Sequence, residues 1–336
     1  MINVCFITDE NYVLPTLVAI QSLIVNSKHK VCVNVVSSQL SEDSQKLFKQ
    51  LATSNCKINI IISSNPGDSI DTKHLYVSKA AMLKFALPQI FSDLDKILYI
   101  DGDVLILDDL NKFWITNLKN NYIAAVADMA GMVEEKHHKK FGFDKYFNSG
   151  VMLLNLKKMR QDDCTSKLIE NKKNDVFKHF MDQDALNQTF NQKVLWLHPK
   201  YNMMRPNLKY SMKEIAQFYG FDIADIKYCY KNPVILHLTN MIKVWKDVNC
   251  PDFKIWYNYF NMLPASEFKN KQNNVYKKAN IHKRINAVTG FIKSLFYKCK
   301  GNKKKYRFFG IPLFYTRKEQ NKKVISVLGI KIKYNK

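Results

Sequence analysis

The hydrophobic pattern begins with short β-rich runs, separated by stretches whose apolar residues recur at helical spacing. The runs lie at residues 3–7, 31–36 and 57–62, and the helical spacing covers residues 14–25. Ser41 predicts the start of a second helix, because a serine followed by acids in the first turn satisfies free amides and suits the helix dipole. The order strand, helix, strand, helix, strand predicts an α/β fold with a mostly parallel mixed sheet flanked by helices.

Polar residues follow several of the predicted strands directly. Further apolar strands are expected at residues 96–100, 122–127, 151–154 and 234–238, after a helical stretch at 78–91. Polar clusters stand at the ends of three strands, at residues 9–11, 101–103 and 128. Ligands of open α/β sheets bind beyond the carboxyl ends of the strands, so these clusters are candidates for one site.

The formal charge of +23 is concentrated in the last part of the 336-residue chain. Residues 269–336 hold 20 Lys and Arg and one acid, Glu319, which leaves +4 for the residues before them. We expect a main body of residues 1–265 and a small basic C-terminal extension of residues 266–336. A basic tail on a nearly neutral body suits an anionic surface, and we favour a membrane because no recognised nucleic-acid motif accompanies the charge.

The pattern of the extension has two parts. From residue 281 to 299, apolar residues recur at helical spacing with basic residues between them, which predicts an amphipathic basic helix. Phe309-Gly310-Ile311-Pro312 then resembles Leu328-Gly329-Ile330-Lys331, and this weak repeat predicts two β-hairpin-like units. Such a tail would bind an anionic membrane surface through apolar area and charge, and a small packed lobe with a solvated basic face is the alternative.

The cysteines and apolar runs bear on the compartment. The seven cysteines are scattered without a C-x-x-C pair, which argues against a disulfide framework or a zinc site and favours a reducing compartment. The start of the chain lacks the pattern of a signal peptide, and no apolar run approaches the roughly 20 residues that span a bilayer. We therefore expect a cytoplasmic protein, held peripherally at the inner face of the cell membrane.

Asp101-Gly102-Asp103 interrupts the apolar run ILYIDGDVLIL and is the central candidate for chemistry. Two aspartates separated by one residue, just past a buried strand, can direct both carboxylates at one cation, and oxygen donors suit Mg²⁺ or Mn²⁺. Gly102 removes side-chain bulk where a ligand has to come close. Because charges are seldom left in an apolar run without a partner, we favour a metal site over a solvated turn or a helix cap.

Four motifs, in this order, resemble those of the family-eight retaining glycosyltransferases: KILYIDGDVLILDDL, FNSGVMLLNLKKMR, DQDALNQTF and HLTNMIKVW. That family comprises GT-A-fold enzymes such as lipopolysaccharide α-galactosyl- and α-glucosyltransferases and glycogenin. The resemblance covers about residues 1–263. It implies a UDP-hexose donor, Mn²⁺ or Mg²⁺ as cofactor, and a glycan or lipid-linked acceptor. It also makes Asp101 and Asp103 metal ligands that, with Gly102, anchor the donor diphosphate.

The last motif carries further expected ligands. His237 matches the family's third protein ligand of the metal, although a histidine at a strand end is more often structural. Lys243 matches a diphosphate-binding lysine, and Asn240 belongs to the same donor-binding loop. The family usually has glycine and proline where this chain has Asn240 and Val244, so backbone contact with phosphate is less secure.

The resemblance also assigns residues in the first half of the chain to the donor. ITDENY resembles the first nucleotide-contacting loop, so Thr8, Asp9 and Asn11 are expected to meet the uridine part. SKAAMLKF resembles a segment that usually carries an arginine near the donor, and here that position is Lys84. Lysine keeps the positive charge for phosphate but loses the bidentate geometry.

A third group of residues is expected on the sugar side of the site. Asp128 resembles a carboxylate that binds the transferred sugar, while Asn148, Asp182 and Gln183 resemble groups that line its reactive face. Helix capping before ALNQTF is the alternative role for Asp182 and Asp184, and we favour Asp182 as the site residue.

Enzymes of this family retain the configuration at the anomeric carbon, and two routes of transfer could do so. A side chain could attack first and form a glycosyl-enzyme, or the acceptor could attack from the face that the diphosphate leaves, with the diphosphate taking the proton. We favour the second route.

The function expected is transfer of galactose or glucose to a lipopolysaccharide or another bacterial surface glycan. A self- or protein-glycosylating transferase and an inactive binding relative are the alternatives.

Overall fold

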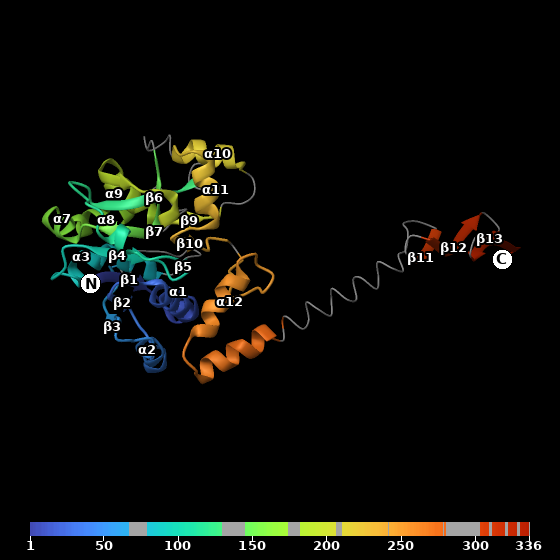
Figure 1. Cartoon of the computed structure of the whole chain (residues 1–336), viewed down its shortest axis with the longest axis horizontal. Helices are drawn as coiled ribbons and strands as arrows, with labels where there is room; N and C mark the ends of the chain where they lie inside the picture. Colours follow the sequence, from blue (N-terminus) through green and yellow to red (C-terminus); the bar gives the residue numbers. More distant parts are fainter. Residues whose placement is uncertain are drawn as a thin grey trace. The chain divides into compact units, whose positions relative to one another are not determined.

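The computed structural model describes residues 1–66, 79–129, 145–173, 182–205, 210–240, 242–277 and 279, and four strands within 303–335. The chain divides into two compact units, Met1–Pro264 and Ala265–Lys336, coloured blue to orange and orange to red in Figure 1.

The first unit is built on a mixed sheet that has seven strands among the described residues (Figure 1). In sheet order these are β3 (Cys56–Ile62), β2 (Val31–Ser37), β1 (Ile2–Ile7), β4 (Ile97–Ile100), β7 (Phe147–Leu154), β6 (Ile123–Ala127) and β8 (Val194–Trp196). Four neighbouring pairs are parallel, and β7 runs antiparallel to β4 and β6. The predicted α/β class with a mostly parallel mixed sheet is confirmed. This polarity brings the carboxyl ends of β1, β4 and β6 and the start of β7 to one edge.

Helices connect the strands and cover the sheet. In chain order they are η1 (Glu10–Tyr12), α1 (Val13–Asn26), α2 (Glu42–Lys49), η3 (Lys79–Ala86), α3 (Leu87–Ile90), α4 (Asn111–Trp114), α7 (Leu156–Gln161), α8 (Cys164–Lys173), α9 (Gln183–Phe190), η4 (Asn191–Lys193), η5 (Pro199–Tyr201), α10 (Met212–Tyr219), α11 (Ile223–Lys231) and α12 (Phe253–Met262). Ser41 caps α2 as predicted, since its hydroxyl accepts the backbone N–H of Ser44. Every residue of β2 is buried, as expected for a strand covered on both faces.

The helix predicted over residues 78–91 has a different form. The described part is the 3₁₀ helix η3 followed by the single α-turn α3, which carries Pro88 at its start. Pro88 lacks the N–H that would bond to the carbonyl of Lys84 in a continuous α-helix, so the α-turn begins afresh at Leu87.

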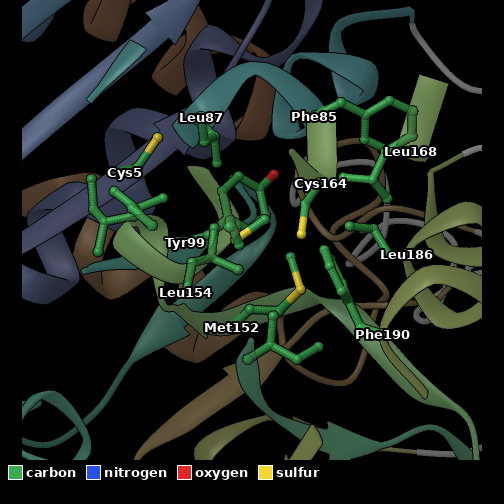
Figure 2. Close-up of a cluster of buried hydrophobic side chains, with 14 of the residues drawn as sticks. Cys5, Phe85, Leu87, Tyr99, Met152, Leu154, Cys164, Leu168, Leu186 and Phe190 are labelled. Atoms are coloured by element: carbon green, nitrogen blue, oxygen red, sulfur yellow. The ribbon is translucent and has the colours of Figure 1, made fainter. Parts of the chain in front are cut away.

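A hydrophobic core lies between the sheet and η3, α3, α8 and α9 (Figure 2). Its sheet side includes Cys5, Tyr99, Met152 and Leu154, and its helix side includes Phe85, Leu87, Cys164, Leu168, Leu186 and Phe190. Because Tyr99 precedes the aspartate pair and Leu186 lies in the first turn of α9, this core holds the end of β4 and the start of α9 in place.

The strand predicted at 234–238 belongs to a second, smaller sheet. It is β10 (Ile235–His237), which pairs antiparallel with β5 (Val104–Ile106) and parallel with β9 (Met203–Met204). His237 lies opposite Val104, directly after Asp103. The strand itself is where the sequence predicts it, and its pairing with β5 carries the histidine to the aspartates.

The second unit contains a four-stranded antiparallel sheet in which neighbours in sequence pair. The strands are β11 (Lys303–Phe308), β12 (Ile311–Glu319), β13 (Lys322–Val327) and β14 (Ile330–Asn335). Ile311 and Ile330 of the sequence repeat begin β12 and β14, so the two hairpin-like units form one sheet. The amphipathic segment at 281–299 lies outside the described residues. Among the residues that are described, no helix has both the length and the apolar character to cross a bilayer.

Candidate active site

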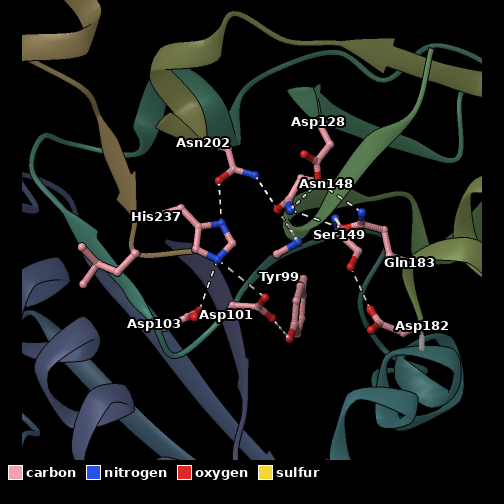
Figure 3. A network of polar contacts seen from close by, with 12 residues as sticks. Tyr99, Asp101, Asp103, Asp128, Asn148, Ser149, Asp182, Gln183, Asn202 and His237 are labelled. Carbon is pink, nitrogen blue, oxygen red and sulfur yellow. Dashed lines mark hydrogen bonds and ion pairs between the residues drawn. The ribbon is translucent and has the colours of Figure 1, made fainter. Parts of the chain in front are cut away.

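Side chains from five segments converge at the edge where β1, β4 and β6 end and β7 begins (Figure 3). The aspartate pair follows β4, Asp128 follows β6, and Asn148 lies at the start of β7. His237 ends β10, and Asp182 and Gln183 stand at the start of α9. The structure thus brings together Asp128 and residues of the four motifs, which are separate in the sequence.

Three of these residues can hold a metal ion. One ligand atom each from Asp101, Asp103 and His237 can be chosen so that all lie within 4.8 Å of one another. His237 Nε2 lies 3.2 Å from Asp103 Oδ1 and 3.9 Å from Asp101 Oδ2. Two carboxylates and one imidazole form a donor set that fits a divalent ion such as Mn²⁺. The predicted third ligand is therefore in reach of the aspartate pair.

Lys243 adds a positive charge beside the same carboxylates. Its Nζ lies 2.6 Å from Asp103 Oδ2 and the side chain is half-buried. Burial would raise the pKa of the Asp103 carboxyl, but His237 and Lys243 outweigh burial and hold that pKa well below its usual range. Asp103 is thus kept ionised, which is the state that a metal ligand needs.

Lys84 lies deeper, between the metal cluster and the sugar-side residues. It is 4% exposed, and its Nζ lies 2.6 Å from Asp182 Oδ2 and 3.4 Å from Asp101 Oδ1. Burial lowers the pKa of Lys84, but the two carboxylates more than reverse this and raise it. Ser149 also donates to Asp182, at 2.8 Å. The carboxylate of Asp182 is therefore engaged with side chains rather than with capping α9.

The sugar-side residues form a buried amide and carboxylate network (Figure 3). Asp128 Oδ2 accepts hydrogen bonds from Asn148 Nδ2 and Gln183 Nε2, each at 3.1 Å. Gln183 Oε1 in turn accepts the backbone N–H of Ser149 at 2.9 Å. Asp184, the less favoured acid, instead accepts from the hydroxyl of Tyr146 at 2.6 Å. The network holds polar groups in fixed orientations beside the metal ligands.

The first loop approaches this edge from β1. Thr8 is buried and Asp9 caps η1 by accepting the backbone N–H groups of Asn11 and Tyr12. Asn11 is exposed, and Tyr12 packs edge-on against Trp245, a neighbour of Lys243, at 5.5 Å between ring centroids. Asn240 is half-buried in the loop after β10. The two loops expected to meet the donor are thus in contact.

Two glycines are required by close packing. A Cβ at Gly102 would lie 2.3 Å from the hydroxyl oxygen of Thr16 in α1, so this glycine makes room for a helix side chain. A Cβ at Gly150 would lie 2.3 Å from His237 Cε1 and 2.6 Å from Asp101 Oδ2. The metal ligands therefore lie directly against the backbone of β7, which the motif FNSG alone did not reveal.

Sequence reasoning missed further residues that touch the site. Tyr99 donates its hydroxyl to Asp101 Oδ1, and Asn202 stands between His237 and Asn148. Tyr99 could have been found from its position two residues before Asp101, on the same side of an extended strand. Asn202 follows η5 in a segment without any motif, so no signal in the sequence marked it.

The family model for glycosyl transferase family 8 matches residues 3–249. The chain belongs to this family. This agrees with the resemblance carried by the four motifs, and it makes the chain a member of a family of glycosyltransferases. The cluster around Asp101 and the network around Asp128 therefore lie within the matched region.

Two curated relatives align with most of the chain. It is 26% identical to a lipopolysaccharide 1,2-glucosyltransferase of Escherichia coli over 78% of both chains. It is 26% identical to general stress protein A of Bacillus subtilis, over 70% of this chain and 85% of the other. The solved galactosyltransferase LgtC, in complex with donor and acceptor sugar analogues, has the same fold. That match has a TM-score of 0.66 at 23% identity and covers 81% of this chain and all of LgtC.

Proposed function

We propose that the protein is a retaining, Mn²⁺-dependent transferase that moves galactose or glucose from a UDP-sugar to a lipopolysaccharide or another bacterial surface glycan. The observation that carries the proposal is the convergence of Asp101, Asp103 and His237 within 4.8 Å, next to Lys243. A divalent ion held there, Mn²⁺ or Mg²⁺, would neutralise negative charge on the leaving diphosphate. Lys243 supplies a second positive charge for the same oxygens.

The amide network suits the recognition of a hexose. Asp128, Asn148 and Gln183 present carboxylate and amide groups that hydroxyls of a sugar can bond to, in orientations that the backbone fixes. Thr8, Asp9 and Asn11 lie at the edge where the uridine part would be bound, with Asn240 in the facing loop.

The contacts of Asp182 favour attack by the acceptor over a glycosyl-enzyme. A carboxylate that bonds to Lys84 and Ser149 is a weak nucleophile, because its negative charge is already compensated. Gln183 is an amide and a weak nucleophile by nature. We infer that the acceptor attacks from the face that the diphosphate leaves, with the diphosphate taking the proton and this chain supplying position and charge.

The acceptor class rests on the relatives and on the tail. One relative is a lipopolysaccharide glucosyltransferase, and lipopolysaccharide precursors are anionic amphiphiles. The strongly basic residues 269–336 suit attachment to an anionic membrane surface. We therefore propose a cytoplasmic protein that works at the inner face of the cell membrane, with a catalytic domain of residues 1–265 and an attachment region of residues 266–336.

A panel of UDP-sugars tests the proposal. The protein is incubated with each donor and Mn²⁺, Mg²⁺ or a chelator, and release of UDP and the thermal midpoint are followed. We expect slow hydrolysis of a UDP-hexose with Mn²⁺ and none with the chelator. Asp103→Asn should lower the rate about 100-fold or more, because a buried charge at the site is lost.

Asp43→Asn is the matched control, since Asp43 is a surface aspartate of α2 with a 92% exposed side chain. It should leave the rate unchanged. If no UDP-sugar is hydrolysed and none shifts the thermal midpoint in the presence of Mn²⁺, the transferase proposal fails. Inversion at the anomeric carbon of a trapped product would refute the retaining mechanism alone.

A further inference from the structure

Asn202 joins the metal ligands to the sugar-side residues through its side chain. Its Oδ1 lies 2.9 Å from His237 Nδ1, and its Nδ2 donates to Asn148 Oδ1 at 2.9 Å. The residue is fully buried. A continuous chain of polar contacts therefore runs from Asp103 through His237, Asn202 and Asn148 to Asp128 (Figure 3).

The orientation of the Asn202 amide follows from a backbone group. Asn148 Oδ1 accepts the backbone N–H of Gly150 at 3.0 Å, and its Nδ2 donates to the carboxylate of Asp128. The atom of Asn148 that faces Asn202 is therefore an oxygen, and Asn202 must present its NH₂ group there. Its oxygen then faces His237, and an oxygen can only accept a hydrogen bond.

This orientation determines which ring nitrogen of His237 carries hydrogen. Nδ1 must hold the hydrogen that Asn202 Oδ1 accepts, which makes Nε2, the nitrogen that faces Asp101 and Asp103, the one whose lone pair a metal ion would take. A metal ligand needs such a lone pair, and outer partners commonly select it. Resting on the proposed function for the metal site, we propose that Asn202 is a positioning residue that sets the tautomer of His237 and couples the metal to Asn148.

Two substitutions separate the two halves of this role. Asn202→Asp keeps an acceptor for His237 but places a carboxylate against the side-chain amide oxygen, Oδ1, of Asn148. We expect it to bind Mn²⁺ at least as well as the wild type, with kcat more than 10-fold lower. Asn202→Ala loses both contacts, so Mn²⁺ affinity should fall about 10- to 100-fold, as is usual when a partner of a ligating histidine is removed.

The measurements report Mn²⁺ binding and the tautomer of His237 as well as activity. Mn²⁺ binding is followed by electron paramagnetic resonance in the presence of UDP. The tautomer is read in the metal-free protein from a long-range ¹H–¹⁵N spectrum, with His237→Gln to assign the signals. The wild type should show hydrogen on Nδ1, Asn202→Asp should retain it, and Asn202→Ala should lose the preference.

Asn34→Ala is the matched control, because Asn34 is a buried amide in β2 that bonds to Val4 and Asn59, away from the site. It should lose stability without losing Mn²⁺ affinity or the tautomer. The inference is overturned if Asn202→Ala binds Mn²⁺ as tightly as the wild type does. It is also overturned if His237 of the wild type carries hydrogen on Nε2 alone. A wild type that binds no Mn²⁺ would instead contradict the proposed function, and the tautomer would still decide the role of Asn202.

Discussion

At the scale of single residues, Gly150 is where the backbone comes closest to the metal ligands. Gly150→Ala would place a Cβ 2.3 Å from His237 Cε1 and 2.6 Å from Asp101 Oδ2. His237 is 5% exposed and cannot retreat without disturbing the core. We expect Mn²⁺ affinity to fall at least 10-fold and stability to fall by about 1–3 kcal/mol, the usual cost of overpacking. Metal titration and urea unfolding measure the two effects.

Gly220→Ala is the control for this change. Gly220 ends α10 with φ at +74° and no atom within 4 Å of an added Cβ, so alanine there is strained but does not crowd any neighbour. It should cost about 1 kcal/mol of stability and leave Mn²⁺ affinity unchanged. If Gly150→Ala binds Mn²⁺ as the wild type does, the close approach is not what shapes the metal site.

Lys84 carries a second prediction at this scale. Lys84→Met leaves Asp182 and Asp101 without their buried partner, and removing one member of a buried pair typically costs about 3–5 kcal/mol. Asp182→Asn in the same chain should recover part of the loss, with a coupling of about 1–3 kcal/mol. Urea unfolding of the wild type, both single variants and the double variant measures this. Additive effects of the two substitutions would contradict the ion pair.

At this scale the sequence indicated candidate residues where a motif fixed the residue types, and their roles stay predictions. The aspartate pair, His237 and the residues around Asp128 were chosen because each occupies a strand or helix end with a family pattern, and the structure brings them together. Lys84 was expected to face phosphate, and its bond to Asp182 could not be foreseen because the two positions are 98 residues apart. Asn202 contacts partners 35 and 54 residues away, and only the folded sheets bring them together.

At the scale of elements, Glu10 ties the first donor loop to the start of α2. Its carboxylate accepts the backbone N–H of Ser41 at 2.6 Å and the hydroxyl of Ser44 at 2.7 Å. The hydrogen bond from the Ser41 backbone, with those of the two serine hydroxyls, lowers the pKa of Glu10 below 4.5 despite its partial burial. An acid at a helix N-terminus is also favoured by the helix dipole. The loop around Asp9 is therefore anchored to a helix outside the site.

Glu10→Gln should destabilise the protein at pH 7 by about 0.5–1 kcal/mol, the typical worth of such a contact. Because the folded pKa is lowered, this contribution is complete above pH 4.5 and is lost as the pH falls through the folded pKa. The difference between variant and wild type in urea unfolding should therefore narrow below pH 4.5. Glu170→Gln, on the exposed side of α8, is the control. A constant difference at every pH would refute the ionic contact.

The elements also show where a hydrophobic pattern stops being informative. The runs of the parallel strands were predicted within a few residues, because burial on both faces leaves a continuous apolar signal. The pattern of β10 is equally apolar, yet β10 pairs with β5 and β9 in a separate sheet. An apolar run indicates that a strand is buried, but it does not indicate which strand it pairs with. The partner here is β5, which begins directly after Asp103.

At the scale of the whole molecule, the two units predict separable functions. Residues 1–264 contain every candidate site residue, and residues 265–336 contain most of the net positive charge. Deletion of residues 265–336 should leave UDP-sugar hydrolysis within about two-fold of the full chain and abolish binding to vesicles of anionic lipid, which depends on basic charge near the surface. Vesicles of neutral lipid are the control for apolar attraction. Unchanged binding to anionic vesicles would contradict attachment through the second unit.

The register of the second sheet allows a sharper test of that attachment. Successive positions of a strand belong to opposite faces of a sheet, so the register places positions Lys305, Lys331 and Lys333 on one face and positions Lys304, Lys318 and Lys323 on the other. The first face carries the larger number of basic residues, and the second carries apolar positions of β13 and β14. Glutamine at the three lysines of the first face should weaken anionic-vesicle binding at least 10-fold more than glutamine at the three of the second. The two triple variants change the net charge equally, so equal losses in vesicle sedimentation would show that total charge, rather than one face of the sheet, governs attachment.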